Sequence, residues 1–178
     1  MRLTTRLRTV LASSAALVLS SATALQAQQP VNLAPNAPAD KPVNLARECQ
    51  LAAMLRATAP LVEQARASYP AARTRFLAGL PPRHTFFVTT LLRDAAGRTE
   101  QVFVVADSIR DGHIAGRIWS QIAVVAGYRL GQPYRFAETA LLDWMIARPD
   151  GSEEGNVVGK FLDTYQPPAT CEKDDHAG

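Results

Sequence analysis

The feature that most constrains the fold is a change in hydrophobic period at the double proline Pro81-Pro82. Before it, from Asn44 on, apolar residues recur at helical spacing, and after it short β-branched and aromatic runs are separated by turn residues. Proline cannot continue a helix, so the boundary is sharp. Helices followed by a series of short strands predict an α+β domain, with N-terminal helices packed on a curved, mostly antiparallel sheet of about five short strands.

The helical part is expected to consist of two or three segments. Asn44 is a suitable N-cap for the first, and Pro60 suits the first turn of the second, where its missing N–H is not needed. Pro70 either breaks this helix or opens a third segment. Gly79 is expected to end the helical part as a C-terminal cap.

The strand part begins with a hairpin, and Asp111-Gly112 between alternating residues predicts a second, two-residue hairpin turn. The segment at 155–165 fits either an edge strand or a short helix. The residues at 109–114 form the Asp111-Gly112 hairpin turn and its flanks, and the expected strands are 85–91, 100–105, 116–125 (which includes Trp119), 134–136 and 141–146. The expected core is Phe76, Leu77, Phe87, Val102, Val104, Ile114, Ile118, Trp144 and Ile146.

The N-terminal segment predicts export. Three arginines precede residue 10, an apolar run extends from Val10 to Leu25, and small residues follow at 22–24 and 25–27. The run is shorter than the ~20 residues that a membrane-spanning helix needs. We therefore expect about residues 1–27 to be a secretory signal peptide, cleaved after either Ala22-Thr23-Ala24 or Leu25-Gln26-Ala27 at the end of the run. The product is expected to be periplasmic or secreted, without stable membrane insertion after cleavage.

The remainder divides into a linker, one domain and a tail. Residues 28–43 are rich in Pro, Ala, Asn and Gln, which is typical of a linker, and Pro-Val-Asn-Leu-Ala occurs at 30–34 and again at 42–46. Residues 44–165 are expected to form a single α+β domain, followed by a polar tail at 166–178.

The charge balance argues against nucleic acid as a partner. Of 19 basic and 16 acidic residues, three basic and no acidic ones lie within 1–27, which leaves 16 of each sign in the remainder. A nucleic-acid-binding domain normally carries a basic excess.

The two cysteines, Cys49 and Cys171, are predicted to form a disulfide, since an even pair in an exported chain is usually oxidised. Two free thiols, or one catalytic thiol, are the alternatives. A nucleophilic cysteine needs a histidine partner, and only His176 lies near either cysteine in the sequence.

From about residue 73 to 165 the chain resembles the bacterial domain of unknown function (DUF) 2314 family. The most specific element is Asp143-Trp144-Met145, spaced correctly after a glycine-bearing turn. The other matching elements are Phe76-Leu77, Glu100-Gln101-Val102-Phe103-Val104, the glycine and isoleucine pattern of 111–118, Tyr128 with Gly131, and Gly155-Asn156. The resemblance implies a fold but no activity, because the family has no established chemistry to transfer.

Asp143 and Glu100 are the candidate catalytic residues. Asp143 lies beside Trp144, and a carboxylate lined by an aromatic ring can bind a ligand or act as a general base. If Glu100 shared its cleft, the two would form an acid–base pair. The structural alternatives are that Asp143 caps or pairs a neighbouring loop and that Glu100 pairs across strands with Arg117. Asp143, Trp144 and Trp119 form the candidate ligand-binding surface.

No metal or cofactor is expected. The loop from Asp150 to Asn156 has oxygen ligands at the first three odd positions of an EF-hand, but its twelfth position is Phe161 instead of glutamate. His84, His113 and His176 show no metal-ligand spacing.

These observations favour a non-catalytic binding or protein-interaction module of the bacterial cell envelope. Its partner would be an unidentified envelope protein or a small ligand. The alternative is a small envelope hydrolase that uses Asp143 and Glu100 as a carboxylate pair.

Overall fold

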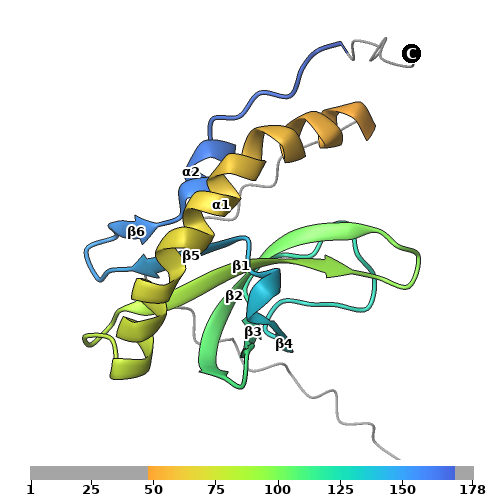
Figure 1. Ribbon diagram of the computed structural model, residues 1–178. Coiled ribbons are helices and arrows are strands. Elements are labelled where there is room, and N and C mark those ends of the chain that lie inside the picture. The colour runs from red at the N-terminus through yellow and green to blue at the C-terminus, as the bar shows by residue number, and fades with distance from the viewer. Residues whose placement is uncertain (1–47, 171–178) are drawn as a thin grey trace, which may run out of the picture. The chain divides into compact units, whose positions relative to one another are not determined.

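The computed structural model describes residues 48–170. The predicted signal peptide, the linker, Cys171 and His176 lie outside these residues. Helix α1 (Glu48–Ala78) precedes a six-stranded sheet of order β4-β3-β2-β1-β5-β6 (Figure 1). The elements after α1 are β1 (Thr85–Arg93), β2 (Thr99–Arg110), β3 (His113–Ile118), β4 (Pro133–Ala137), the short 3-10 helix η1 (Glu138–Ala140), β5 (Asp143–Ala147), β6 (Glu153–Gly155) and α2 (Val157–Leu162).

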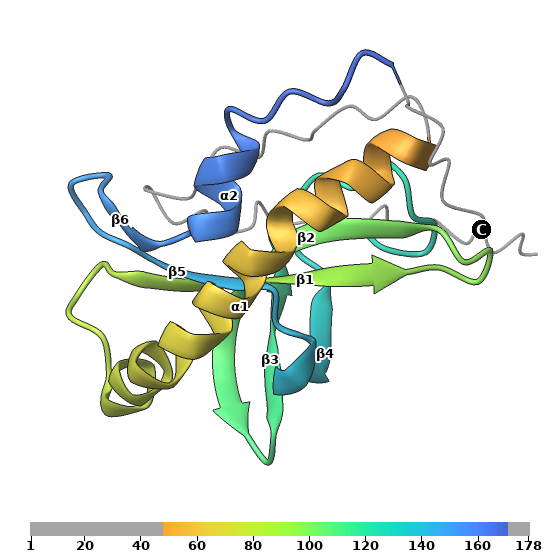
Figure 2. The ribbon, with the colours of Figure 1, turned by 45° about the horizontal axis from the view of Figure 1, so that its top comes forward.

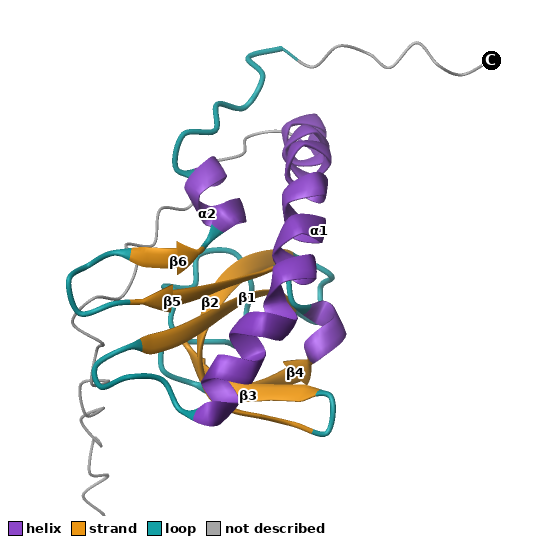
Figure 3. Cartoon of the chain, turned by 60° about the vertical axis from the view of Figure 1, so that its left-hand side comes forward, coloured by secondary structure: helices purple, strands orange, loops and turns teal. Residues whose placement is uncertain are grey.

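The predicted α+β class with an antiparallel sheet is confirmed. Every pair of neighbouring strands is antiparallel, and the sheet has six strands where about five were expected. α1 runs diagonally across the sheet, as Figure 2 shows, and α2 lies beside α1 (Figure 3). The ambiguous segment at 155–165 contains the end of β6 and all of α2.

The prediction of two or three separate helical segments is wrong, because α1 continues through Pro60 and Pro70. Each proline inside a helix removes a hydrogen bond and costs about 3 kcal/mol. Both prolines are exposed, so the carbonyl groups left without partners can be hydrated. The buried stripe of Ala65, Tyr69 and Ala72 crosses Pro70 and packs on the sheet, which holds the helix together. Gly79 ends it as predicted, with φ of 92°.

The β2–β3 turn confirms the Asp-Gly prediction. Asp111 and Gly112 both have positive φ, 53° and 68°, as a type I′ hairpin turn requires. The register of β2 against β3 shifts between Ala106 and Ser108, as at a β-bulge, and a bulge bends the strand that contains it.

The strand expected over 116–125 is wrong beyond Ile118, where β3 ends. Trp119 N–H still donates to the carbonyl of Phe103 at 2.8 Å, but the Ser120 hydroxyl then accepts the Phe103 N–H at 2.9 Å. A side chain thus replaces the backbone acceptor, and the ladder stops. Residues 119–132 form a loop, called here the 119–132 loop.

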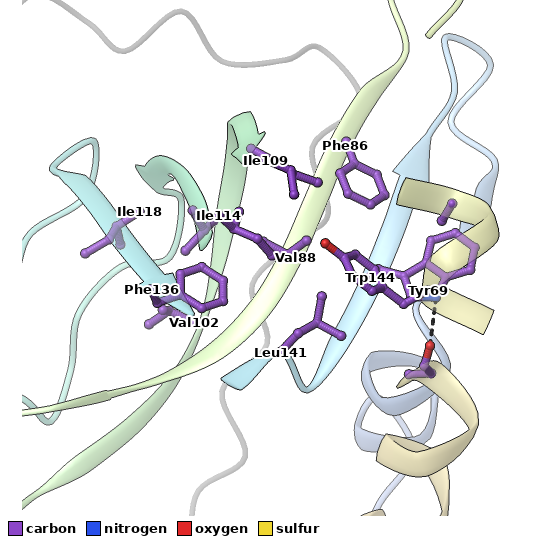
Figure 4. Close-up of a cluster of buried hydrophobic side chains, with 14 of the residues drawn as sticks. Tyr69, Phe86, Val88, Val102, Ile109, Ile114, Ile118, Phe136, Leu141 and Trp144 are labelled. Carbon is purple, nitrogen blue, oxygen red and sulfur yellow. Dashed lines mark hydrogen bonds between the residues drawn. The ribbon is translucent and has the colours of Figure 1, made fainter. Parts of the chain in front are cut away.

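The main hydrophobic cluster lies between α1 and the sheet. Trp144 anchors the helix to it, because its Nε1–H donates to the Ala65 carbonyl at 3.1 Å and to the Ser68 hydroxyl at 3.0 Å. Figure 4 shows Trp144 next to Tyr69 of α1, with Phe136 and Ile118 at the opposite end of the cluster. Its largest members are Tyr69, Phe86, Val88, Leu92, Val102, Val104, Ile109, Ile114, Ile118, Val125, Phe136, Leu141, Trp144 and Ile146.

A second, smaller cluster is formed by Phe87, Trp119, Met145 and Ala147, with Phe103 and Val105 packed against it. Most of the predicted core residues are buried in one of the two clusters, and Phe76 is partly buried against the first. Leu77 was expected in the core but is 51% exposed. It follows Phe76 by one position, and neighbouring helical residues face different directions.

Two polar contacts add to the packing of α1. Tyr69 donates its hydroxyl hydrogen to Glu138 Oε2 at 2.8 Å, and Arg73 Nε donates to the same oxygen at 2.8 Å. Burial and the neighbouring carboxylate raise the pKa of Tyr69 well above its usual range, so the phenol stays protonated. These bonds hold the C-terminal half of α1 to Glu138 of η1.

The first turn of α1 lies close to the C-terminal segment. Gln50 Nε2 donates to the carbonyl of Pro168 at 3.0 Å. Gln50 follows Cys49 in the sequence, and Pro168 precedes Cys171 by three positions, so the contact brings the surroundings of the two cysteines together. Because Cys171 lies outside the described residues, the disulfide stays a prediction, and this proximity supports it.

Candidate functional site

Asp143 is a buried acceptor of backbone hydrogen bonds. Asp143 is the first residue of β5 and is 1% exposed. Oδ1 accepts the Trp144 N–H at 2.8 Å, and Oδ2 accepts the Val158 N–H at 2.7 Å and, more weakly, the Gly159 N–H at 3.4 Å. Burial raises the pKa of Asp143, and the backbone N–H groups oppose that shift. The carboxylate therefore caps α2, as the structural alternative proposed.

The chain around Asp143 forms a tight junction of β5, β6 and α2, called here the β5–α2 junction. Gly155 has φ of 77°, and a Cβ there would collide with the carbonyl oxygen of Trp144 and lie 2.9 Å from its indole Cε3. Asn156 follows with φ of 55° and donates its N–H to the Trp144 carbonyl at 2.8 Å. A Cβ on Gly159 would collide with the Asn156 side chain. Gly155 has no space for a side chain, because the nearest atom belongs to the backbone, whereas a side chain at Gly159 would have to displace that of Asn156.

Glu100 organises the 119–132 loop. Oε1 accepts the Ala123 N–H at 2.8 Å, and Oε2 accepts those of Val124 and Val125 at 2.8 and 3.0 Å. Asp94 continues the pattern, because its Oδ2 accepts the Ala126 N–H at 3.1 Å. Four consecutive N–H groups thus form an anion-binding nest that the chain fills with its own carboxylates.

The expected cross-strand pair of Glu100 with Arg117 does not form. The residue opposite Glu100 is Leu92 of β1, and the residue opposite Arg117 on β2 is Val105. Burial raises the pKa of Glu100, but the three backbone hydrogen bonds outweigh it, so the net shift is downward. The ionised carboxylate is the form that holds the loop.

This downward shift predicts acid sensitivity of the 119–132 loop. A carboxylate with a lowered folded-state pKa contributes stability above its unfolded pKa, about 4.3, and loses it as pH falls through the folded value. Glu100→Gln is therefore expected to flatten the decline of the free energy of unfolding between about pH 5 and pH 3, measured by urea unfolding. Glu63→Gln is the control, since the Glu63 side chain is 74% exposed and pairs with Arg66. An equally steep decline in the Glu100 variant would contradict this role.

Asp143 and Glu100 are not brought together. β1 lies between their strands, with Thr89 opposite Asp143 and Leu92 opposite Glu100. Thr89 and Leu92 are three residues apart, and strand side chains alternate between faces, so the two carboxylates belong to opposite faces of the sheet. Each binds a different set of backbone N–H groups.

The candidate ligand-binding surface of Asp143, Trp144 and Trp119 is not a surface. The two tryptophans are 6% and 9% exposed, and they belong to different clusters. Trp144 packs under α1, whereas Trp119 packs edge-on against Phe87, with ring centroids 5.9 Å apart. All three residues support the fold.

The loop at Asp150 is a hydrogen-bonded turn. Asp150 Oδ1 accepts the Ser152 N–H at 2.9 Å and its hydroxyl hydrogen at 2.7 Å. Within residues 48–170, no three His, Cys, Asp or Glu side chains gather in a way that would hold a metal ion. No helix in the same range is long and apolar enough to cross a membrane.

A surface pocket of about 280 Å³ is lined by residues from the end of α1, from the segment that follows it, and from the region of β5 and β6. Its polar lining is Arg75, His84, Arg148 and Glu154, and its apolar lining includes Leu80 and Ile146. We call it the Arg75 pocket.

Glu154 joins the two arginines of the Arg75 pocket. Arg75 binds it with both terminal nitrogens, at 2.6 and 3.0 Å, and Arg148 Nη2 lies 2.9 Å from Oε2. The arginines, Arg75 first, hold the pKa of Glu154 below its usual range. Sequence reasoning missed this site, because the arginines are 73 positions apart and follow no motif.

Comparison with protein families, with curated proteins and with solved structures finds no match to this chain. The DUF 2314 resemblance therefore stays a prediction that rests on the residues quoted for it.

Proposed function

We propose that this chain is an exported, non-catalytic binding module of the bacterial cell envelope, related to the DUF 2314 family. The observation that carries the proposal is the use of Asp143 and Glu100 as acceptors for separate sets of backbone N–H groups. A carboxylate pair must face one substrate to act as acid and base, and residues on opposite faces of a sheet do not. Export is supported by the signal-peptide pattern in residues 1–27.

The binding role is supported by the Arg75 pocket. It combines charged groups with apolar walls, which is the usual composition of a small-ligand site. The hydrolase alternative has no comparable support, since neither candidate carboxylate lines this pocket.

A substrate panel tests the absence of catalysis. The mature protein is incubated with chromogenic esters, peptides and glycosides, in parallel with Glu100→Gln. We expect no turnover above the buffer rate for either protein. Turnover by the wild type that disappears in a folded Glu100→Gln variant would contradict the proposal and favour the hydrolase.

A cross-linked pull-down from envelope extract, with the mature protein as bait, then identifies any protein partner.

A further inference from the structure

The charge of the Arg75 pocket indicates the kind of ligand that it accepts. Among the side chains that line the pocket, there are two guanidinium groups and one carboxylate, so the lining itself carries one more positive than negative charge. The C-terminal end of α1, at Ala78 and Gly79, opposes an anion with roughly half a negative charge that fades within one turn. The positive excess is larger, so the pocket favours an anion.

Two donors of the pocket are suited to hold that anion. Both terminal nitrogens of Arg75 bind Glu154, while Arg75 Nε has no hydrogen-bond partner within residues 48–170. The His84 ring contacts the Pro82 carbonyl through Nδ1 at 3.2 Å, and Nε2 has no partner in the same range. A planar carboxylate suits a guanidinium edge better than a spherical anion does.

The apolar lining and the volume of the pocket limit the polarity and the size of the rest of the ligand. Leu80, Pro81 and Ile146 line the pocket beside the charged groups. A volume of about 280 Å³ lies just below the range typical of drug-sized ligands. The pocket therefore suits a carboxylate joined to one short aliphatic group.

Resting on the binding role proposed above, we infer that the Arg75 pocket binds a carboxylate that carries a short aliphatic chain. This chemistry has two sources, a free short-chain acid and the C-terminal residue of a polypeptide that ends in an aliphatic side chain. Arg75 and His84 bind the carboxylate, and Leu80 and Ile146 contact the aliphatic part.

Chemical-shift titration of the ¹⁵N-labelled mature protein tests this inference. The probes are butyrate, its neutral isostere butyramide, the peptide Gly-Gly-Val with a free carboxylate, and the same peptide amidated. We expect butyrate or the peptide with a free carboxylate to shift the backbone N–H signals of Gly79, Leu80, His84 and Arg148. Butyramide and the amidated peptide should leave these signals unchanged. Binding of butyrate identifies a free acid as sufficient, and binding of the peptide alone identifies a polypeptide C-terminus.

Variants separate a specific site from general attraction. Arg75→Gln is expected to weaken binding at least about tenfold, because the anion loses its guanidinium partner. Arg73→Gln is the matched control, since Arg73 lies on the same helix and pairs with Glu138 outside the pocket. It should leave binding within about twofold. If Arg75→Gln does not fold, His84→Gln replaces it, with a severalfold loss expected.

The inference is overturned if no carboxylate shifts these residues, if butyramide shifts them as strongly as butyrate, or if Arg73→Gln weakens binding as much as Arg75→Gln. Such a failure is distinct from failure of the binding role, which would appear as turnover in the substrate panel.

Discussion

Replacing Gly155 with alanine is expected to lower the free energy of unfolding by about 3 kcal/mol or more. The new methyl group would collide with the Trp144 carbonyl and indole, in a backbone conformation that already disfavours side chains. The β5–α2 junction must open to accommodate it, which exposes Trp144 and weakens the contact between α1 and the sheet. Urea unfolding monitored by tryptophan fluorescence measures the loss.

Gly151→Ala is the matched control. Gly151 has a similar φ of 82°, but a Cβ there would meet nothing within 4 Å. Only the backbone strain remains, and a loss of about 1–2 kcal/mol is expected. Equal losses in the two variants would show that close packing at Gly155 contributes nothing.

Asp143→Asn is expected to destabilise the domain by about 2–3 kcal/mol, without affecting any activity. Each carboxylate oxygen of Asp143 accepts a backbone N–H, from Trp144 at Oδ1 and from Val158 at Oδ2. In asparagine one of these oxygens is replaced by NH₂, which cannot accept a hydrogen bond, so one buried N–H loses its acceptor. Thermal and urea unfolding measure the effect, and hydrogen exchange at Val158 should rise with it.

Asp150→Asn is the control for this substitution. Asp150 also accepts backbone and hydroxyl hydrogen bonds, but it is exposed and water can replace them. We expect a loss of less than about 1 kcal/mol. If Asp143→Asn lowered the free energy of unfolding as little as Asp150→Asn, the role of Asp143 as a buried structural acceptor would be contradicted.

The sheet was predictable because its signals are local. The Asp111-Gly112 turn, the β-branched and aromatic composition of β1 and the alternation of apolar residues in β2 define strands within a few positions. The continuity of α1 was not predictable, because it depends on which side of the helix faces the sheet. Pro60 and Pro70 lie on its exposed side, and only packing partners far along the chain define that side.

The roles of Asp143 and Glu100 were also beyond local reasoning. Apart from the neighbouring Trp144 N–H, their partners are backbone N–H groups 15 to 25 positions away, and a backbone N–H has no residue type for a sequence pattern to report. The structural role of Asp143 also suggests why the residues that resemble DUF 2314 occur together. Asp143, Trp144, Gly155 and Asn156, which carry the resemblance, are the residues of the β5–α2 junction, so we propose that these motif positions serve the fold.

A double-mutant cycle between Asp143→Asn and Glu100→Gln tests the separation of the two carboxylates most directly. Because they share no hydrogen-bond partner and belong to opposite faces of the sheet, the two losses in free energy of unfolding should add to within about 0.5 kcal/mol. A coupling free energy above about 1 kcal/mol would contradict this, and would indicate that the two carboxylates interact as a pair.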